Sequence, residues 1–135
     1  MAKVVLSVLL FVVVLAMASA AYADNQPAGR EYQVKWDFPT GDKYYSAVQG
    51  KTYYVGDSLK FTYMQEMHNV VKVGSFEDFN QCTMTKPLSP EFADGATSMP
   101  LDKPGVHYFI CSIPGHCSDG MKIKVLAINR PRKLM

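Results

Sequence analysis

The chain has 135 residues, of which 48% are hydrophobic, and a formal net charge of +2. This length is sufficient for one domain with a modest core, and the small net charge provides no long-range field that would attract a nucleic acid. The basic cluster formed by Arg130, Arg132 and Lys133 stands near the end of the chain, where such residues are usually solvated. We therefore expect no nucleic-acid partner.

Residues 1–23 have the pattern of a secretory signal peptide. Lys3 is followed by an apolar run over 4–17, and an Ala-Tyr-Ala tripeptide that fits the cleavage pattern of signal peptidase ends at Ala23. The apolar run is short for a membrane span, and the C-terminal region carries no apolar anchor signal. We expect cleavage after Ala23, a mature domain at 24–135, and secretion without a membrane anchor.

Short segments of alternating polar and apolar residues, or of β-branched and aromatic residues, predict a β-rich domain. The expected strands cover residues 32–36, 52–55, 59–63, 70–73, 106–111 and 123–128. Residues 86–104 carry four prolines and a glycine and are expected to be mostly loop. Many short strands in a chain of this size favour an all-β, antiparallel sandwich with Greek-key connections.

A short helix is expected after Ser75. Ser75 and Asp78 resemble a capping box, in which the first residue caps the helix and the second reaches back to it. Phe76 and Phe79 are three positions apart and would share one face of this helix.

Four residues with soft or borderline donor atoms indicate a metal site. Cys111, His116 and Met121 follow one another at intervals of five residues on the loop between the last two expected strands, and His68 stands at the join between two others. Two imidazoles, one thiolate and a weak thioether are the ligand set of a blue-copper site. The pattern therefore predicts one copper ion in a type 1 site, with the ligands His68, Cys111, His116 and Met121.

The chain has three cysteines, so at least one thiol must stay unpaired. In an exported protein the other two are expected to form a disulfide. Cys117 directly follows His116, so its side chain should point away from the metal. Pairing it with Cys82 closes a loop of roughly 35 residues, which contributes about 4 kcal/mol in the chain-entropy account. Cys111 is then left for the metal.

Other interpretations of these residues are weaker. Taken alone, His68 would more often be a surface or turn residue, and Met121 would be core filler; their joint pattern with the loop favours ligands. A nucleophile and base pair of Cys111 and His116 lacks a third, orienting residue, and methionine is a poor zinc ligand. His107 matches no ligand position and is expected to be structural.

Further segments of the chain carry a family pattern. They are Tyr54-Val-Gly-Asp57, His68-Asn-Val70, Pro104-Gly105, Tyr108-Phe-Ile-Cys-Ser-Ile-Pro-Gly-His-Cys117 and Gly120-Met121. Together they resemble the plant phytocyanins, and among these the plantacyanin or basic blue protein subgroup, over residues 31–126. The resemblance implies a cupredoxin-like Greek-key β-sandwich of seven or eight strands with a short helix. It also implies the same four copper ligands and a disulfide between Cys82 and Cys117.

Individual positions refine this resemblance. Met121 stands where the stellacyanin branch of the family carries Gln, which favours the plantacyanin subgroup. Val34 and Lys35 replace a usual Gly pair before Trp36, and Val48 stands about where a second Trp is common. These departures concern packing and the register of the first strand, not the ligands.

The expected function is extracellular electron transfer by Cu(II)/Cu(I) cycling. Four protein ligands would leave no open position on the metal, so we expect no enzymatic activity. Electrons are expected to pass through the exposed edge of His116, beside a small apolar docking surface formed by Pro114 and Gly115. The partner is an unknown redox protein or small molecule, and the protein is expected to be a monomer of the apoplast or cell wall.

Two other functions stay open at this point. One is signalling or cell-wall interaction in plant reproduction, as some plantacyanin-like proteins suggest, and the other is copper storage. A storage protein should release copper on reduction, and a signalling protein should keep its activity without metal. A redox carrier should be reduced and reoxidised without losing the ion.

Overall fold

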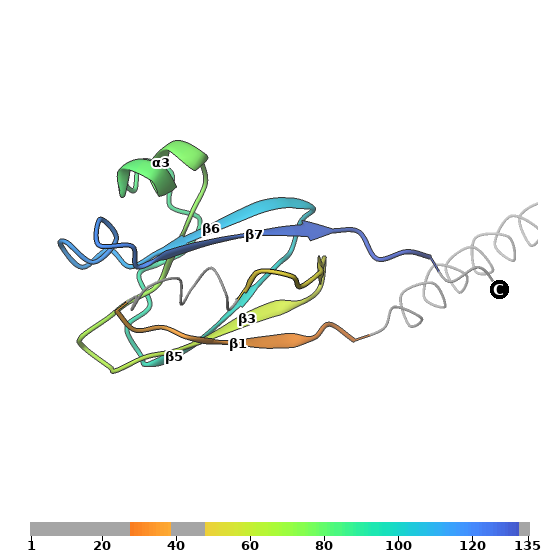
Figure 1. Ribbon diagram of the computed structural model, residues 1–135, viewed down its shortest axis with the longest axis horizontal. Coiled ribbons are helices and arrows are strands. Elements are labelled where there is room, and N and C mark those ends of the chain that lie inside the picture. The colour runs from red at the N-terminus through yellow and green to blue at the C-terminus, as the bar shows by residue number, and fades with distance from the viewer. Residues whose placement is uncertain (1–27, 39–47, 133–135) are drawn as a thin grey trace, which may run out of the picture.

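The structure, a computed structural model, describes residues 28–38 and 48–132. The expected signal peptide and its cleavage site lie outside these ranges. The strands are β1 (Glu31–Lys35), β2 (Tyr53–Tyr54), β3 (Ser58–Thr62), β4 (Val71–Val73), β5 (Ala96–Pro100), β6 (Gly105–Ile110) and β7 (Lys122–Ile128), and helix α3 covers Phe76–Gln81 (Figure 1). Within the described ranges, no helix has the length and apolar composition needed to cross a membrane.

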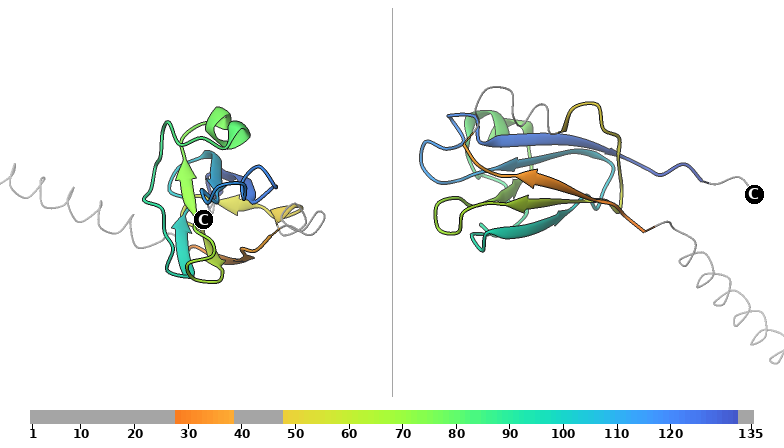
Figure 2. Two further views of the ribbon diagram at one scale, coloured as in Figure 1. Left: turned by 90° about the vertical axis from the view of Figure 1, so that its left-hand side faces the viewer. Right: turned by 60° about the horizontal axis from the view of Figure 1, so that its bottom comes forward.

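The seven strands of the described part of the chain form two sheets, with the orders β1-β3-β5 and β2-β7-β6-β4. From β1 to β6 each strand lies in the opposite sheet from the strand before it, and β6 and β7 then form a hairpin. Viewed from the end that carries the β6–β7 loop, the two sheets form the two sides of a sandwich (Figure 2). The predicted all-β sandwich with a short helix is confirmed.

Two strand pairs differ from the predicted antiparallel arrangement. β1 pairs in parallel with β3, and β2 pairs in parallel with β7. The remaining pairs, β3 with β5, β4 with β6 and β6 with β7, are antiparallel. The predicted antiparallel pairing is therefore confirmed for three pairs and wrong for these two, whose strands are separated in the chain by strands of the other sheet and are not joined by a hairpin.

Alternate residues of the strands fill the space between the sheets. In β7, Ile123, Val125 and Ala127 are buried, whereas Ile128 is 43% exposed. Val34 of β1 is buried as well. This is the period of two that a half-buried strand requires.

Trp36, directly after β1, is fully buried in the core. Its ring meets the Phe61 ring edge to face, with 5.0 Å between the centroids. Its Nε1–H donates a hydrogen bond of 2.8 Å to the backbone carbonyl of Asn69. The contact satisfies the buried indole and ties β1 to the segment that precedes β4.

Residues 96–100 form β5, where the sequence predicts a loop. β5 pairs with β3, and Thr97 and Met99 are buried. The Tyr63 hydroxyl lies 2.7 Å from the Thr97 hydroxyl. Ala and Pro are weak strand formers, so the local sequence pattern does not predict a strand here. Pairing with β3 and burial of alternate residues outweigh this weak preference. β5 is an edge strand, a position that tolerates Pro100.

Arg130 is not part of a solvated tail. Its guanidinium forms an ion pair with the fully buried Asp57 and lies 5.0 Å from the centroid of the Tyr54 ring. Asp57 also accepts hydrogen bonds of 2.9 Å from the backbone N–H groups of Arg30 and Tyr54. The expectation of a solvated cluster is therefore wrong for Arg130, although Arg132 is exposed.

Helix α3 begins after Ser75, as predicted. Ser75 Oγ accepts a hydrogen bond of 3.1 Å from the backbone N–H of Asp78, which makes Ser75 the N-cap. The rings of Phe76 and Phe79 lie 6.4 Å apart, so these residues share a face of the helix. The predicted helix and its Ser75 cap are confirmed, but the second half of the capping box is wrong, because the Asp78 carboxylate bonds to residues after the helix instead of reaching back to Ser75.

The carboxylate of Asp78 serves the segment that follows the helix. It accepts hydrogen bonds of 2.7 Å from the hydroxyls of Thr83 and Thr85 and one of 2.9 Å from the backbone N–H of Lys86. Burial alone would raise the pKa of Asp78, but these donors outweigh it and lower the pKa to about 2. The carboxylate therefore stabilises the fold in its ionised form.

Replacing Asp78 should change how stability depends on pH. Because the pKa of Asp78 is depressed in the folded state, its stabilising contribution is complete above the ordinary value of 3.8 and is lost as the pH falls through about 2. We expect Asp78→Asn to lower the free energy of unfolding at pH 7 and to flatten its fall in this acid range, measured by urea unfolding at several pH values. Glu77→Gln, on the same helical turn, is the matched control, and equal pH profiles of the two variants would contradict the assignment.

Candidate metal centre

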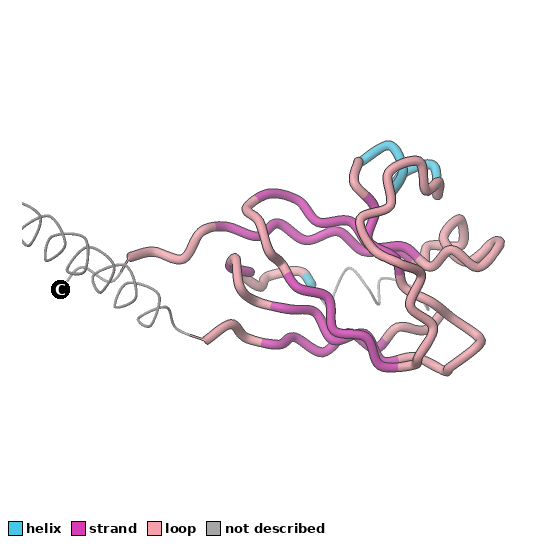
Figure 3. Tube along the Cα trace, turned by 180° about the vertical axis from the view of Figure 1, so that it is seen from behind, coloured by secondary structure: helices cyan, strands magenta, loops and turns pink. Residues whose placement is uncertain are grey.

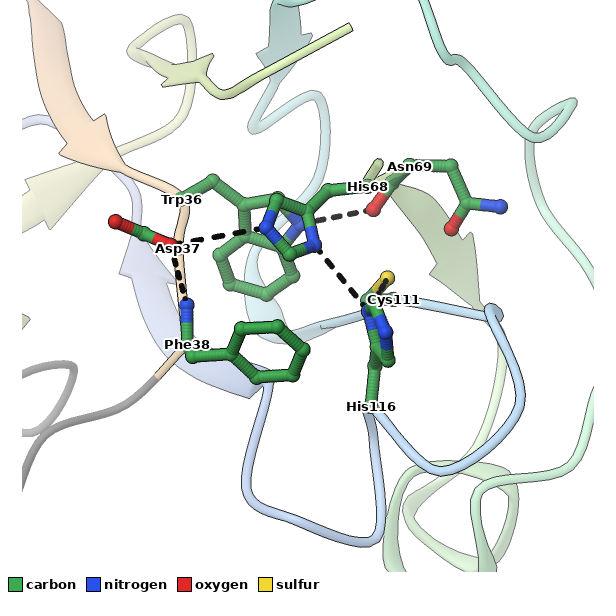
Figure 4. Close-up of polar contacts among 7 residues, drawn as sticks. All are labelled: Trp36, Asp37, Phe38, His68, Asn69, Cys111 and His116. Atoms are coloured by element: carbon green, nitrogen blue, oxygen red, sulfur yellow. Dashed lines mark hydrogen bonds and ion pairs between the residues drawn. The ribbon is translucent and has the colours of Figure 1, made fainter. Parts of the chain in front are cut away.

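His68, Cys111 and His116 come together at one end of the sandwich (Figure 4). Their candidate donor atoms all lie within 4.8 Å of one another. Nδ1 of His68 lies 3.2 Å from Nδ1 of His116, and Sγ of Cys111 lies 3.5 Å from that same nitrogen. Three of the four predicted ligands thus direct their donor atoms to one place, as a single metal ion requires.

Two separate segments of the chain supply these residues. His68 follows a turn closed by hydrogen bonds from the backbone N–H groups of Met67 and His68 to the carbonyl of Met64, at 3.2 and 3.3 Å. Cys111 directly follows β6, an inner strand of its sheet, and His116 lies in the loop to β7. Several loops gather at one end of the sandwich (Figure 3), which is the end that carries the β6–β7 loop in Figure 1.

The three residues differ in solvent exposure, and burial shifts the pKa of two of them. His68 and Cys111 are buried, whereas His116 is partly exposed. Burial lowers the pKa of His68, and the neighbouring His116 lowers it further, which favours a neutral imidazole with a free lone pair. Burial also raises the pKa of the Cys111 thiol, so a metal ion must displace the thiol proton when it binds.

Met121 is fully buried, and its backbone is tied to both ligands of the loop. Its N–H donates to the carbonyl of His116 at 2.9 Å, and its carbonyl accepts from the N–H of Cys111 at 3.0 Å. The side chain belongs to the core cluster that also contains Cys111. Its role as the fourth donor stays a prediction.

Hydrogen bonds within the loop between β6 and β7 define its shape. The N–H of His116 donates to the carbonyl of Ile113, and the N–H of Asp119 donates to that of Gly115, both at 3.0 Å. Gly115 has a φ of 86°, a left-handed conformation that favours glycine. Pro114 and Gly115 are exposed, so the predicted bend lies on the surface beside His116.

Cys82 and Cys117 form a disulfide, and the thiol of Cys111 is free and buried, as predicted. Cys82 is the C-cap of α3, so the bridge connects this helix to the residue directly after His116. Cys117 is buried in a small cluster apart from the main core. The bridge therefore ties the β6–β7 loop to helix α3 through a cluster that is separate from the one containing Cys111.

An amide clamp that the sequence analysis missed connects the two ligand segments. Asn69, next to His68, accepts a hydrogen bond from the backbone N–H of Ser112 and donates another to its hydroxyl, both at 2.8 Å. The Ser112 hydroxyl in turn donates to the carboxylate of Glu91. Because Ser112 follows Cys111, the clamp holds the thiol segment against the first imidazole segment. A polar residue beside a predicted ligand is the signal that could have revealed it.

Two residues after the buried Trp36 also lie at the centre, and the sequence analysis missed both. The Phe38 ring meets the rings of His68 and His116, with centroid distances of 5.1 and 4.5 Å. Asp37 Oδ1 lies 3.7 Å from Nε2 of His68 (Figure 4). No local pattern marks these positions, because their contacts with the imidazoles join distant parts of the chain.

His107 lies apart from the three ligands. It is buried in β6, and its Nε2 lies 2.7 Å from the backbone carbonyl of Lys103. This contact accords with the structural role expected for it.

The two-sheet sandwich, with a cysteine and a histidine on the loop between its last two strands and a second histidine facing them, defines the cupredoxin class of metal-binding domains. The plastocyanin-like domain family matches residues 36–121. The chain belongs to the phytocyanin family of blue copper proteins.

Individual relatives agree with this assignment. A blue copper protein from Pisum sativum is 42% identical over 85 residues, which is 63% of this chain but only 44% of the pea protein. Among solved structures, spinach plantacyanin is 35% identical with a TM-score of 0.60, and the cucumber basic protein, a blue copper protein, is 38% identical with a TM-score of 0.61. In both cases the match covers 72% of this chain and 98% of the other.

Removing the disulfide should weaken both the fold and the metal site. The bridge closes a loop with a sequence separation of 35 residues, so we expect the paired change Cys82→Ala with Cys117→Ala to cost roughly 2 to 4 kcal/mol in guanidinium unfolding of the metal-free protein. Copper affinity should fall as well, because Cys117 anchors the residue beside His116. For the unfolding of the metal-free protein, Cys111→Ala removes a thiol without breaking the bridge and is the control; for copper affinity the wild type is the reference, because Cys111 is itself a predicted ligand. Equal stability of the paired variant and the wild type would contradict this prediction.

Proposed function

We propose that this protein binds one copper ion through His68, Cys111, His116 and Met121 and carries single electrons outside the cell. The observation that supports this most is the convergence of two Nδ1 atoms and a free thiol in a domain of blue-copper type. Copper bound there would supply one-electron exchange between its two oxidation states.

The residues fit copper better than other metals. Thiolate and imidazole together suit copper and zinc, but Met121 as a fourth ligand is suited to copper and is a poor ligand for zinc. Both His68 and Cys111 are buried, which keeps water away from the inner side of the centre. Four protein ligands would leave no open position for a substrate, so the proposed role is electron transfer rather than catalysis.

The surroundings of the ligands suit rapid electron transfer because they restrict movement. The amide of Asn69 fixes Ser112, and the disulfide fixes Cys117. Ligands held in this way rearrange little when the charge of the site changes, and a small rearrangement lowers the barrier to transfer.

A redox partner would approach the site from the side of His116. This ligand is partly exposed, and Pro114 and Gly115 beside it are exposed as well. Phe38, whose ring meets His116, is 41% exposed and extends the apolar surface. An apolar patch around an exposed ligand edge suits brief contact with a redox protein or small molecule, and we propose that the protein acts as a monomer.

Two features of the chain support an extracellular site of action. The disulfide between Cys82 and Cys117 is a bond that persists in oxidising compartments. The signal-peptide pattern at residues 1–23 agrees with this. We therefore propose that the protein works in the apoplast or cell wall.

Serine in place of Cys111 tests the ligand assignment. A thiolate bound to Cu(II) gives an intense visible charge-transfer band, and serine oxygen cannot replace it. We expect copper-loaded Cys111→Ser to lose that band in an absorption spectrum. His107→Gln changes a histidine outside the site and should stay blue. A blue Cys111→Ser variant would rule out the proposed ligand set.

Substitutions of Met121 test the axial position. Gln offers a harder oxygen donor, which favours Cu(II) and should lower the reduction potential, whereas Leu removes the donor and should raise it. The expected order in a redox titration is Met121→Leu above wild type above Met121→Gln, with all three proteins coloured. Met99→Leu, which changes another buried methionine, should leave the potential unchanged. Equal potentials of the wild type and the two variants would mean that Met121 is a core side chain and not a ligand.

A further inference from the structure

A carboxylate lies beside the outer nitrogen of His68. Asp37 Oδ1 is 3.7 Å from Nε2 of the ring, and Figure 4 shows this contact on the side of the ring away from Cys111 and His116. The imidazole is 3% exposed and the Asp37 side chain 51% exposed. The contact thus joins a buried ring to a charge at the surface.

The two nitrogens of His68 face different surroundings. Nδ1 lies 3.2 Å from Nδ1 of His116, on the side where the candidate donors converge, and Nε2 faces Asp37. A neutral imidazole carries its proton on one nitrogen, and an ionised carboxylate can only accept a hydrogen bond. The carboxylate therefore favours the proton on Nε2, which leaves the lone pair of Nδ1 directed to the metal side.

The local backbone holds Asp37 in this position. Its Oδ1 accepts a hydrogen bond of 2.8 Å from the backbone N–H of Phe38. The preceding residue, Trp36, is fully buried and bonded to the carbonyl of Asn69. The Phe38 ring lies against His68, with centroids 5.1 Å apart. Asp37 thus lies between a buried anchor, Trp36, and a residue whose ring packs on His68.

We propose that Asp37 is a positioning residue of the metal centre, whose carboxylate fixes the Nε2–H tautomer of His68 and favours the oxidised over the reduced metal. This inference rests on the proposed copper site. A negative charge behind an imidazole ligand makes the ligand more basic and stabilises the more positive ion. At 3.7 Å and half exposed, the contact acts through charge rather than through a short hydrogen bond, so its effect is moderate.

The experiment compares the wild type with Asp37→Asn and Asp37→Ala in two measurements. The first is the reduction potential of the copper-loaded protein. We expect both variants to lower the ratio of Cu(II) to Cu(I) affinity about three- to tenfold. At ~59 mV per tenfold change for one electron, this raises the potential by roughly 30 to 60 mV. The second is the ¹⁵N NMR spectrum of the His68 ring in the metal-free full chain at neutral pH, where the Nε2–H form should dominate in the wild type and lose population in both variants.

Glu31→Gln is the matched control, because it removes the same charge from the exposed start of β1, about 20 Å away along an extended chain. It should change neither measurement. An unchanged tautomer population in the Asp37 variants, or a potential that moves as much in Glu31→Gln as in Asp37→Asn, would overturn the proposal. If the wild type bound no copper, the proposed function would fail, and the NMR comparison would still decide whether Asp37 sets the tautomer of His68.

Discussion

The two hydrogen bonds between the Asn69 amide and Ser112 join chain segments that lie 43 residues apart, and the placement of the candidate ligands His68 and Cys111 depends on them. Both bonds are 2.8 Å, so the amide uses its oxygen and its nitrogen at once and has a single orientation. A neutral hydrogen bond contributes only about 1 kcal/mol to stability, but leaving a buried partner unsatisfied costs more. The clamp therefore selects one separation between His68 and Cys111 rather than adding much to the stability of the fold.

Other parts of the fold hold the same two segments from different directions. Trp36 bonds to the carbonyl of Asn69 and brings the end of β1 to the first segment. The disulfide of Cys117 joins the second segment to helix α3. The β6–β7 hairpin closes the ligand loop through the bond from the N–H of Cys111 to the carbonyl of Met121. Candidate ligands taken from separate elements are thus held in place by contacts of their neighbours within the protein.

Local patterns of the sequence were sufficient to predict the three residues whose donor atoms the structure brings together, but not their surroundings. The spacing of Cys111, His116 and Met121, and the odd thiol, can be read from short stretches of chain. β5 could not be predicted, because its strand character comes from pairing with β3. The ion pair of Arg130 could not be predicted either, because its partner Asp57 is 73 residues away. Asp37 and Phe38 likewise meet the imidazoles only in the folded chain. In each case a tertiary contact outweighs a weak local preference.

The two imidazoles are chemically identical groups, and the fold gives them different environments. His68 is buried with a carboxylate behind it, whereas His116 is partly exposed and bordered by apolar residues of the loop. In the proposed copper site, charge near the first ring would affect which oxidation state is favoured, and the surface around the second would affect which partner can approach. Phe38 touches both rings. A substitution of Phe38 would therefore affect both the favoured oxidation state and the access of a partner. A substitution of Asp37 would affect only the surroundings of His68, and one of Pro114 only those of His116.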